Sequence, residues 1–293
     1  TVLVAFAFLT VGLGIKMAVF PLHTWLPGAY ADAPSVVTAF IAATSTKVSV
    51  YAFLRVVYRI FSPEFAFGDM LLGEALLLLA LIGIFAASAA AIFQDDVKRL
   101  LAFSSVAQIG YMLLGISLAD RAGLTGGIVH MFNHALIKGG LFMVVGCLAY
   151  RLGSTRIDDM RGVARTMPWT ATAFAVGGLA LIGVPLTAGF ISKWLLLTSS
   201  IEGGRFATAA LMLISSLLAV AYVWKVVEVM FFGQPSARVS RLREAPAAML
   251  APTYAVIFLT LMFGVWTTYS VGPAQNAADL LLSAVPQALE ITP

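Results

Sequence analysis

Gly183-Val-Pro-Leu-Thr-Ala-Gly-Phe-Ile-Ser-Lys193 is the stretch that decides the fold, because it puts helix-breaking residues and a lysine inside long apolar sequence. Proline lacks a backbone N–H and clashes with the preceding turn, so an apolar helix over 169–200 should break near Pro185. An ammonium at the centre of a bilayer costs roughly 2.5 to 3.5 kcal/mol on insertion scales. We therefore predict a broken membrane helix with a lysine beside the break; a plain proline kink is the alternative.

A second stretch, near the start of the chain, has the same features. Gly12 and Gly14 precede Lys16, and Pro21 follows it. Paired broken helices in corresponding halves of a chain are typical of inverted-repeat transporters. The pattern therefore predicts two broken helices, each with a lysine at the break.

The composition places the protein in a membrane. The chain is 60% hydrophobic and 11% charged, whereas soluble domains carry about 25% charged residues. Lysine and arginine cluster in short loops between apolar spans, so the net charge of +4 does not indicate nucleic-acid binding. The single cysteine, Cys147, lies inside a span and offers neither an intrachain disulfide nor a metal cluster.

Eight segments are apolar and long enough to cross a bilayer, which takes about 20 residues. They are 1–20, 35–60, 70–93, 98–119, 123–150, 169–200, 206–232 and 248–270. Only helices fit, because their backbone hydrogen bonds close within each segment. We expect an all-α polytopic membrane protein, with residues 274–290 as a short amphipathic helix at the surface. Because residue 1 already lies in apolar sequence, the chain is interpreted as part of a longer one.

Loop charges predict the orientation in the membrane. One set of alternating loops carries Lys98, Arg99, Arg151, Arg156, Arg161, Arg165, Arg238, Arg241 and Arg243, whereas the other carries Arg55, Arg59, Arg121 and Arg205. By the positive-inside rule the first set is cytoplasmic. We therefore expect a protein of the cell inner (cytoplasmic) membrane whose C-terminus lies outside. Lys225 and Glu228, near the cytoplasmic end of their span, are interpreted as an interfacial pair.

Lys47 lies within Thr44-Ser-Thr-Lys47-Val-Ser49, so hydroxyl groups surround it in the sequence. A lysine snorkelling to the interface is the alternative interpretation. However, roughly 20 Å of helix separates Lys47 from either end of its span. That depth favours a functional lysine.

His130, His134 and Lys138 follow one another at intervals of four residues, with Asn133 beside them. Helix residues at i and i+4 share a face, so the three should form one polar stripe that faces the interior of the bundle. Because histidine titrates near neutral pH and passes protons either way, the stripe favours a proton relay. Hydrogen bonding between helices and a metal site are the alternatives, although no Cys, Asp or Glu nearby in the sequence completes a metal site.

Lys193 has no carboxylate near it in the sequence. Bringing an acid close, or taking it away, would load or unload the proton on this lysine, as a pump element requires. The chain has no Gly-rich phosphate loop after a strand, no Ser–His–Asp arrangement and no HExxH pattern. We therefore expect a secondary transporter subunit rather than an enzyme, with no cofactor and no bound metal.

Several motifs resemble those of the proton-translocating antiporter-like family, which covers the large membrane subunits of respiratory complex I and of Mrp-type Na⁺/H⁺ antiporters. The motifs are Lys16-Met-Ala-Val-Phe-Pro-Leu-His-Thr-Trp-Leu-Pro27, Asp32-Ala-Pro34, Thr46-Lys47-Val48, Asp96-Val-Lys-Arg-Leu-Leu-Ala-Phe-Ser-Ser105, His130-Met-Phe-Asn-His134-Ala-Leu-Ile-Lys138 and Gly183 to Lys193. The resemblance covers nearly the whole chain. Asp159-Met-Arg-Gly162, Met167-Pro-Trp169 and Ser192-Lys193-Trp194 look most like the D-type member of the Mrp branch.

The resemblance implies a role for each matching residue. Lys16 matches a broken-helix lysine that pairs with a glutamate in a first half-channel, and Lys47 matches a connecting lysine. His134 and Lys138, with His130 beside them, match the central polar axis. Lys193 matches the terminal lysine of a second half-channel.

The chain departs from the family in length. The family has about fourteen helices on two inverted five-helix repeats, and the spans here resemble the seventh to the fourteenth. Residues 1–60 would then end the first repeat, 61–232 would form the second, and 233–293 would add a final span and a short tail. The glutamate expected to partner Lys16 has no counterpart here in a matching context.

We therefore expect a proton-translocating subunit of a multisubunit Na⁺/H⁺ antiporter, which works with other membrane subunits and exchanges protons for monovalent cations. Two alternatives stay open. The chain could belong to a redox-driven pump, either a complex I-type NADH-quinone oxidoreductase or a membrane-bound hydrogenase. It could also be a structural membrane subunit without a complete channel of its own.

Overall fold

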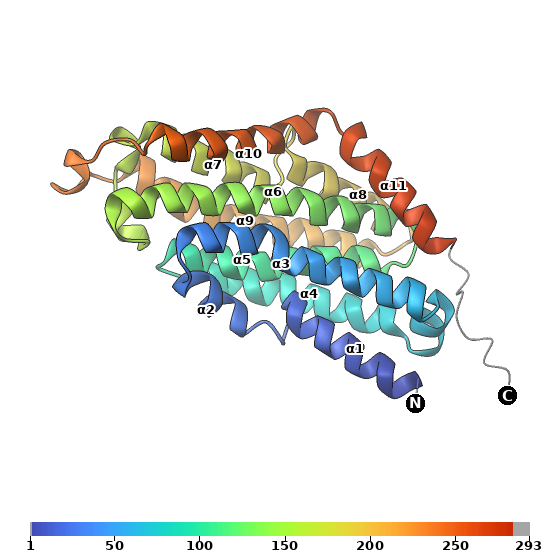
Figure 1. Ribbon diagram of the computed structural model, residues 1–293. Helices are drawn as coiled ribbons and strands as arrows, with labels where there is room; N and C mark the ends of the chain where they lie inside the picture. The colour runs from blue at the N-terminus through green and yellow to red at the C-terminus, as the bar shows by residue number, and fades with distance from the viewer. Residues whose placement is uncertain (1, 284–293) are drawn as a thin grey trace.

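The computed structural model describes residues 2–283, and every regular element in that range is a helix (Figure 1). The longer helices are α1 (Val2–Met17), α2 (Trp25–Asp32), α3 (Ser35–Arg55), α4 (Leu72–Ile92), α5 (Val97–Ser117), α6 (Arg121–Leu152), α7 (Pro168–Ile182), α8 (Ala188–Glu202), α9 (Phe206–Phe232), α10 (Ala247–Val265) and α11 (Thr268–Leu282). Two π-helical segments, Val56–Ile60 and Glu64–Asp69, join α3 to α4, and 3-10 turns lie at Ile157–Met160, Val163–Arg165 and Val239–Arg241.

Within residues 2–283, six helical segments are long and apolar enough to cross a membrane: Ser35–Ile60, Leu72–Ile92, Val97–Ser117, Arg121–Leu152, Phe206–Phe232 and Ala247–Val265. Each coincides with a predicted span. The other two predicted spans, 1–20 and 169–200, contain the shorter apolar helices α1 and α7 and end or break where glycine and proline occur. The prediction of an all-α polytopic membrane protein with two broken helices is therefore confirmed.

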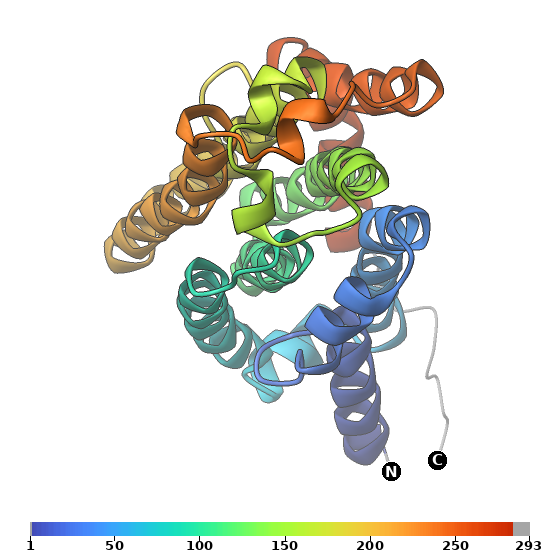
Figure 2. The ribbon, with the colours of Figure 1, turned by 90° about the vertical axis from the view of Figure 1, so that its left-hand side faces the viewer.

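Helix α6 is the centre of the bundle, since it packs against α3, α5, α7, α8, α10 and α11. Figure 2 shows the green α5 and α6 between the blue N-terminal helices and the orange C-terminal ones. Small residues let α5 and α6 approach closely: a Cβ atom on Gly115 would lie 2.6 Å from the carbonyl oxygen of Gly123 and 2.8 Å from the Cα of Gly127. Close backbone packing through small residues is how membrane helices associate without a hydrophobic driving force.

At the break between α7 and α8, the backbone of α7 contacts that of α8, and the backbone of α10 contacts the segment between them. Gly183, at φ +90°, ends α7, and Leu186 adopts a positive φ of 73° before α8 begins. A Cβ atom on Gly189 would lie 1.9 Å from the carbonyl oxygen of Ala180, and one on Gly264 of α10 would lie 2.4 Å from that of Leu186. Glycine is required at both positions because any side chain would push these segments apart.

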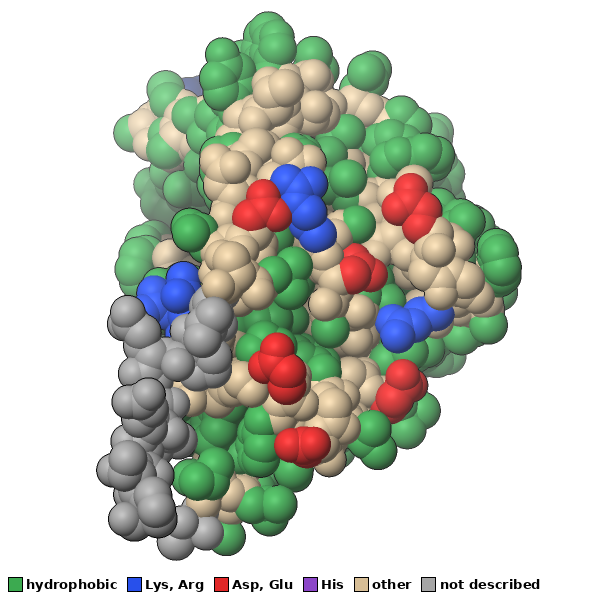
Figure 3. All heavy atoms as spheres, turned by 90° about the vertical axis from the view of Figure 1, so that its right-hand side faces the viewer, with side chains coloured by type: hydrophobic (Ala, Val, Ile, Leu, Met, Phe, Trp, Pro, Cys, Tyr) green, Lys and Arg blue, Asp and Glu red, His purple; other side chains and the backbone are tan. Residues whose placement is uncertain are grey.

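The connections α4–α5, α6–α7 and α9–α10 lie together at the left-hand end in Figure 1, so the loops with more basic residues share one end of the molecule. The opposite end holds the start of α1 and the end of α11 (Figure 1). Figure 3 faces this opposite end, where acidic and basic side chains lie scattered among hydrophobic ones. There Arg121, at the start of α6, forms a bidentate ion pair with Asp279 of α11, at 2.5 and 2.9 Å.

Two sequence expectations need correction. The tail helix was expected over 274–290, but α11 already begins at Thr268 and ends at Leu282, and residues 284–290 lie outside the described range. Lys225 was expected to pair with Glu228, but its ammonium lies 3.5 Å from the carboxylate of Asp95 and donates to the carbonyl oxygens of Gln94 and Ile92, at 2.8 and 3.1 Å. The lysine turns to these carbonyls because α4 ends there with unsatisfied acceptors.

Candidate functional site

Five predicted residues come together as a buried Lys/His set: Lys47, His130, His134, Lys138 and Lys193. They come from α3, α6 and α8, and none of them is more than 9% exposed. Buried charged and polar side chains at this depth must be hydrogen-bonded or solvated to be tolerated. Their partners therefore indicate what the set can do.

The stripe on α6 has the geometry that its spacing predicts. The rings of His130 and His134 stack with centroids 6.1 Å apart and planes within 3° of each other. One turn further on, Lys138 donates to the carbonyl oxygen of Leu101 at 2.8 Å and to the hydroxyl of Ser104, both on α5. The stripe thus faces the interior of the bundle, as expected.

The two histidines keep unused hydrogen-bonding capacity. Nδ1 of His130 lies 2.8 Å from the hydroxyl oxygen of Ser192 on α8. Its Nε2, both ring nitrogens of His134 and Oδ1 of Asn133 have no hydrogen-bond partner among the described residues. Buried polar atoms of this kind are usually bonded to ordered water. The stripe can therefore hold waters between ionisable groups, as proton transfer requires.

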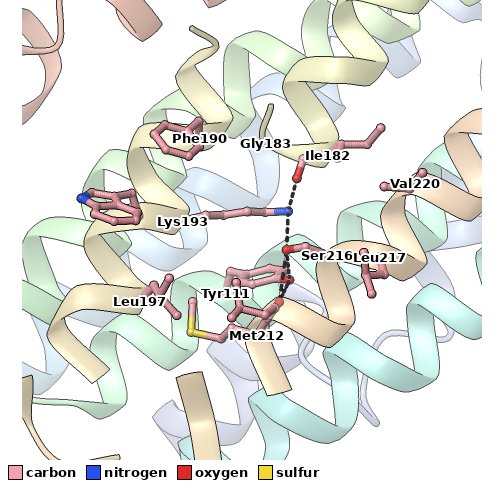
Figure 4. A pocket seen from close by; sticks show the side chains of 12 residues that line it. Tyr111, Ile182, Gly183, Phe190, Lys193, Leu197, Met212, Ser216, Leu217 and Val220 are labelled. Atoms are coloured by element: carbon pink, nitrogen blue, oxygen red, sulfur yellow. Dashed lines mark hydrogen bonds between the residues drawn. The ribbon is translucent and has the colours of Figure 1, made fainter. Parts of the chain in front are cut away.

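Lys193 is held by the break itself (Figure 4). Its ammonium donates to the carbonyl oxygen of Ile182 at 2.8 Å and lies 3.5 Å from the hydroxyl oxygen of Ser216 on α9. The last carbonyls of a helix lack intrahelical donors and carry the negative end of the helix dipole. By ending at Ile182, α7 thus supplies the acceptor that a lysine without a nearby acid needs, which a plain proline kink would not do.

Tyr111 of α5 is the residue that sequence reasoning missed. Its ring centroid lies 4.8 Å from Nζ of Lys193 and 5.5 Å from the ring of His130. Its hydroxyl lies 2.5 Å from the hydroxyl oxygen of Ser215. Tyr111 thus lies next to both Lys193 and His130 of the buried Lys/His set. The face of its aromatic ring attracts the ammonium of Lys193. A lone tyrosine in an apolar helix carries no sequence signal that could have singled it out.

Lys47 reaches the set from α3, which packs along α6. Its side chain is 6% exposed, and its ammonium donates to the carbonyl oxygen of Ala42. The hydroxyl of Thr46 beside it is buried without a hydrogen-bond partner among the described residues. Burial at this position rules out the snorkelling alternative.

Lys16 lies apart from the buried Lys/His set. It belongs to the last turn of α1 and is exposed. Within residues 2–283, no acidic side chain lies within 4.0 Å of its ammonium. The helix therefore breaks next to Lys16, as the sequence predicts, but among the described residues Lys16 has no glutamate partner of the kind that the resemblance implies.

In the part of the chain that the structure describes, no three His, Cys, Asp or Glu side chains lie close enough together to hold a metal ion. His130 and His134 alone would supply two ligands, whereas protein zinc sites use three or four.

Known proteins resemble this chain in both sequence and structure. The family described as NADH:quinone oxidoreductase/Mrp antiporter, TM, matches residues 1–219. NADH-quinone oxidoreductase subunit N of Desulforudis audaxviator is 41% identical over 86% of the chain and 52% of the relative. The D subunit of the Na(+)/H(+) antiporter of Alkalihalophilus pseudofirmus is 29% identical over 89% of the chain and 52% of the relative.

A solved structure of the Mrp complex from Dietzia sp. DQ12-45-1b contains a similar chain, with a TM-score of 0.89 and 27% identity. The match covers 96% of this chain and 60% of that one. The chain thus spans about half the length of the curated relatives that it matches.

Proposed function

Because this chain belongs to the NADH:quinone oxidoreductase/Mrp antiporter transmembrane family, we propose that its buried Lys/His set carries protons through the membrane bundle. The chain is a multi-pass, antiporter-like membrane subunit of the kind found in Mrp and complex I assemblies. The observation that carries the proposal is the shared burial of the set: its ionisable side chains come from α6 and from two helices that pack against it, α3 and α8.

The contacts suggest how a proton would move. A proton arriving near Lys47 passes by way of water to His134 or Lys138, and the unpartnered nitrogens of His134 and His130 hold the waters between them. From His130 it reaches Lys193 past Ser192 and Tyr111. Two neighbouring ammonium groups repel each other in a low-dielectric interior. A proton entering at one end therefore drives the next one onward.

The sequence comparison favours a redox-driven complex as the first candidate. Identity to the NADH-quinone oxidoreductase subunit N is 41%, against 29% for the D subunit of the Na(+)/H(+) antiporter. In such a complex, electron transfer in other subunits would supply the energy for proton movement.

Exchange of protons for Na⁺ or another monovalent cation in an Mrp-type antiporter is the second candidate. The TM-score of 0.89 to a chain of the Mrp complex favours it, together with the motifs that look like those of the D-type member. NADH-driven proton uptake by inverted vesicles would support the first candidate, and Na⁺-driven proton release would support the second.

Several finer expectations belong to the same proposal. Other membrane subunits would be the partners, and the end of the molecule with the nine basic residues in and next to its loops would face the cytoplasm, which puts the C-terminus outside. Residues 61–232 would form one five-helix repeat, with 1–60 ending the preceding repeat and 233–293 following it. Lys16 would act with a carboxylate from outside the described residues.

The test is proton flux in inverted membrane vesicles that contain the complete complex. Lys47→Ala and Lys193→Ala should each lower the flux by about a hundredfold, as expected for the loss of a proton-transfer group. Lys225→Ala is the matched control, since this lysine also lies in a span but contacts the end of α4 instead of the set. Normal flux in assembled Lys47 and Lys193 variants would refute the proposal and leave the structural alternative.

A further inference from the structure

A cavity of about 270 Å³ opens beside Lys193, between α8 and α9. Apolar side chains form most of its wall, among them Phe190, Trp194 and Leu197 of α8 and Leu213 and Leu217 of α9. Trp194 is 52% exposed and Leu217 is 67% exposed, so the mouth of the cavity lies on the outer surface of the bundle, within its apolar spans. A molecule dissolved in the bilayer can therefore reach it without passing through water.

The inner end of the cavity is polar and basic. Lys193, which is 9% exposed, extends into it, and Ser216 and the ring of Tyr111 flank the ammonium (Figure 4). Of the contacts that the ammonium makes, the bond to Ile182 at 2.8 Å is short, whereas those to Leu181 and Ser216 are both 3.5 Å. Within residues 2–283 no carboxylate lies within 4.0 Å of Lys193. The ammonium thus retains donor capacity toward a ligand that carries negative charge.

From this combination we infer that the cavity binds a membrane-permeant, medium-chain carboxylic acid, with its apolar chain between α8 and α9 and its carboxylate on Lys193. The apolar wall matches an alkyl chain, and the lone ammonium at the inner end matches a carboxylate. The volume is just below the roughly 300 to 1,000 Å³ of pockets for drug-sized ligands, which suits a short or medium chain. Ser216, in the middle of α9, donates its hydroxyl hydrogen to the carbonyl oxygen of Met212 at 3.1 Å, so Lys193 is the donor that would hold the carboxylate.

The acid enters in its neutral form, because a free carboxylate would not cross the apolar mouth. The acid is received by Lys193 in its uncharged form: the O–H bond of the acid breaks, Nζ gains the proton, and the ammonium formed in this way holds the carboxylate. The products are a carboxylate and an ammonium in contact, so charge and atoms balance and no redox partner is needed. Binding of this kind holds the proton on Lys193, and it does not require that the protein translocates protons.

Photolabelling of the full chain in its native membrane vesicles tests the inference. The probes are a medium-chain carboxylic acid with a terminal diazirine and the alcohol of the same length, each mapped by mass spectrometry of the α8 and α9 peptides. The acid should label these peptides about tenfold more than the alcohol, since hydrogen bonds to charged groups contribute about 1.5 kcal/mol or more. Equal labelling by the two probes would overturn the inference and indicate a cavity filled by lipid chains.

Two kinds of variant separate the charge from the shape. Lys193→Met should reduce labelling by the acid to the level of the alcohol, because methionine can neither accept the proton of the acid nor pair with its carboxylate. Leu217→Trp should close the mouth and reduce labelling by the acid, while Leu261→Trp on α10, also exposed and outside the cavity, should leave it unchanged. Labelling by the acid that persists in Lys193→Met or in Leu217→Trp would overturn the inference. It would also be overturned if the wild-type protein were not labelled because a neighbouring protein covers the mouth of the cavity.

Discussion

The two broken helices have the same local design but different surroundings. In each, a lysine lies beside the break and a non-glycine residue in the break adopts a positive φ, Ala18 at 62° in the first and Leu186 at 73° in the second. Yet Lys193 is buried with a carbonyl partner, whereas Lys16 is exposed. The comparison teaches that glycine and proline decide where a helix breaks, while the neighbouring helices decide what the lysine can do.

The largest expected effect concerns the backbone at the second break. Gly189→Ala would place a Cβ atom 1.9 Å from the carbonyl oxygen of Ala180, so α7 and α8 would have to separate. We expect a loss of about 3 kcal/mol or more in the free energy of unfolding, at the upper end of overpacking costs. Gly12→Ala in the first broken helix is the control, since a Cβ atom there meets nothing within 4 Å. Unfolding in mixed detergent micelles measures both, and similar stabilities would contradict the difference between the two breaks.

The next effect concerns access to the two lysines. In the 293-residue chain with Cys147 replaced by alanine, Lys16→Cys should react with a membrane-permeant maleimide about tenfold or more faster than Lys193→Cys, because thiol reactivity follows exposure. Mass spectrometry of timed samples gives the two rates. Equal rates would mean that the environments of the two lysines do not differ in the way that their burial indicates.

The smallest expected effect is on stability, and it concerns the exposed ion pair of Arg121 and Asp279, in contrast to the buried Lys/His set. The hydrogen bonds and charge of Arg121 hold the pKa of Asp279 below its ordinary value. A lowered folded-state pKa stabilises the protein above the unfolded-state pKa of about 4, and the contribution disappears as the pH falls through the folded-state value. Because both side chains are exposed, the effect should be small and should weaken with salt.

Thermal unfolding of the wild type and of Asp279→Asn measures this contribution. The variant should melt slightly below the wild type at pH 7, and the difference should vanish in strong acid. A difference that persists there would assign the effect to packing of α11 instead of charge.

Much of the fold was predictable because a bilayer restricts the possible structures. Long apolar segments must be helices, so the spans at 35–60, 70–93, 98–119, 123–150, 206–232 and 248–270 match observed helices closely. The ends were less predictable: α11 begins before the expected tail helix, because capping and packing at a helix terminus depend on neighbours. Lys225 likewise finds Asp95, more than a hundred residues away in the chain, instead of Glu228.

The sequence by itself determined the membrane location, the helical class, both breaks and the shared face of His130, His134 and Lys138, since these follow from local composition and from the helical repeat. Only the tertiary structure decided that Lys47 and Lys193 join that face, that Lys16 stays outside it, and that Tyr111 links His130 to Lys193. The physical reason is that burial and partner choice depend on which helices pack together. That packing is set by contacts between residues far apart in the chain, among them the glycines that let α5, α6, α7 and α8 approach.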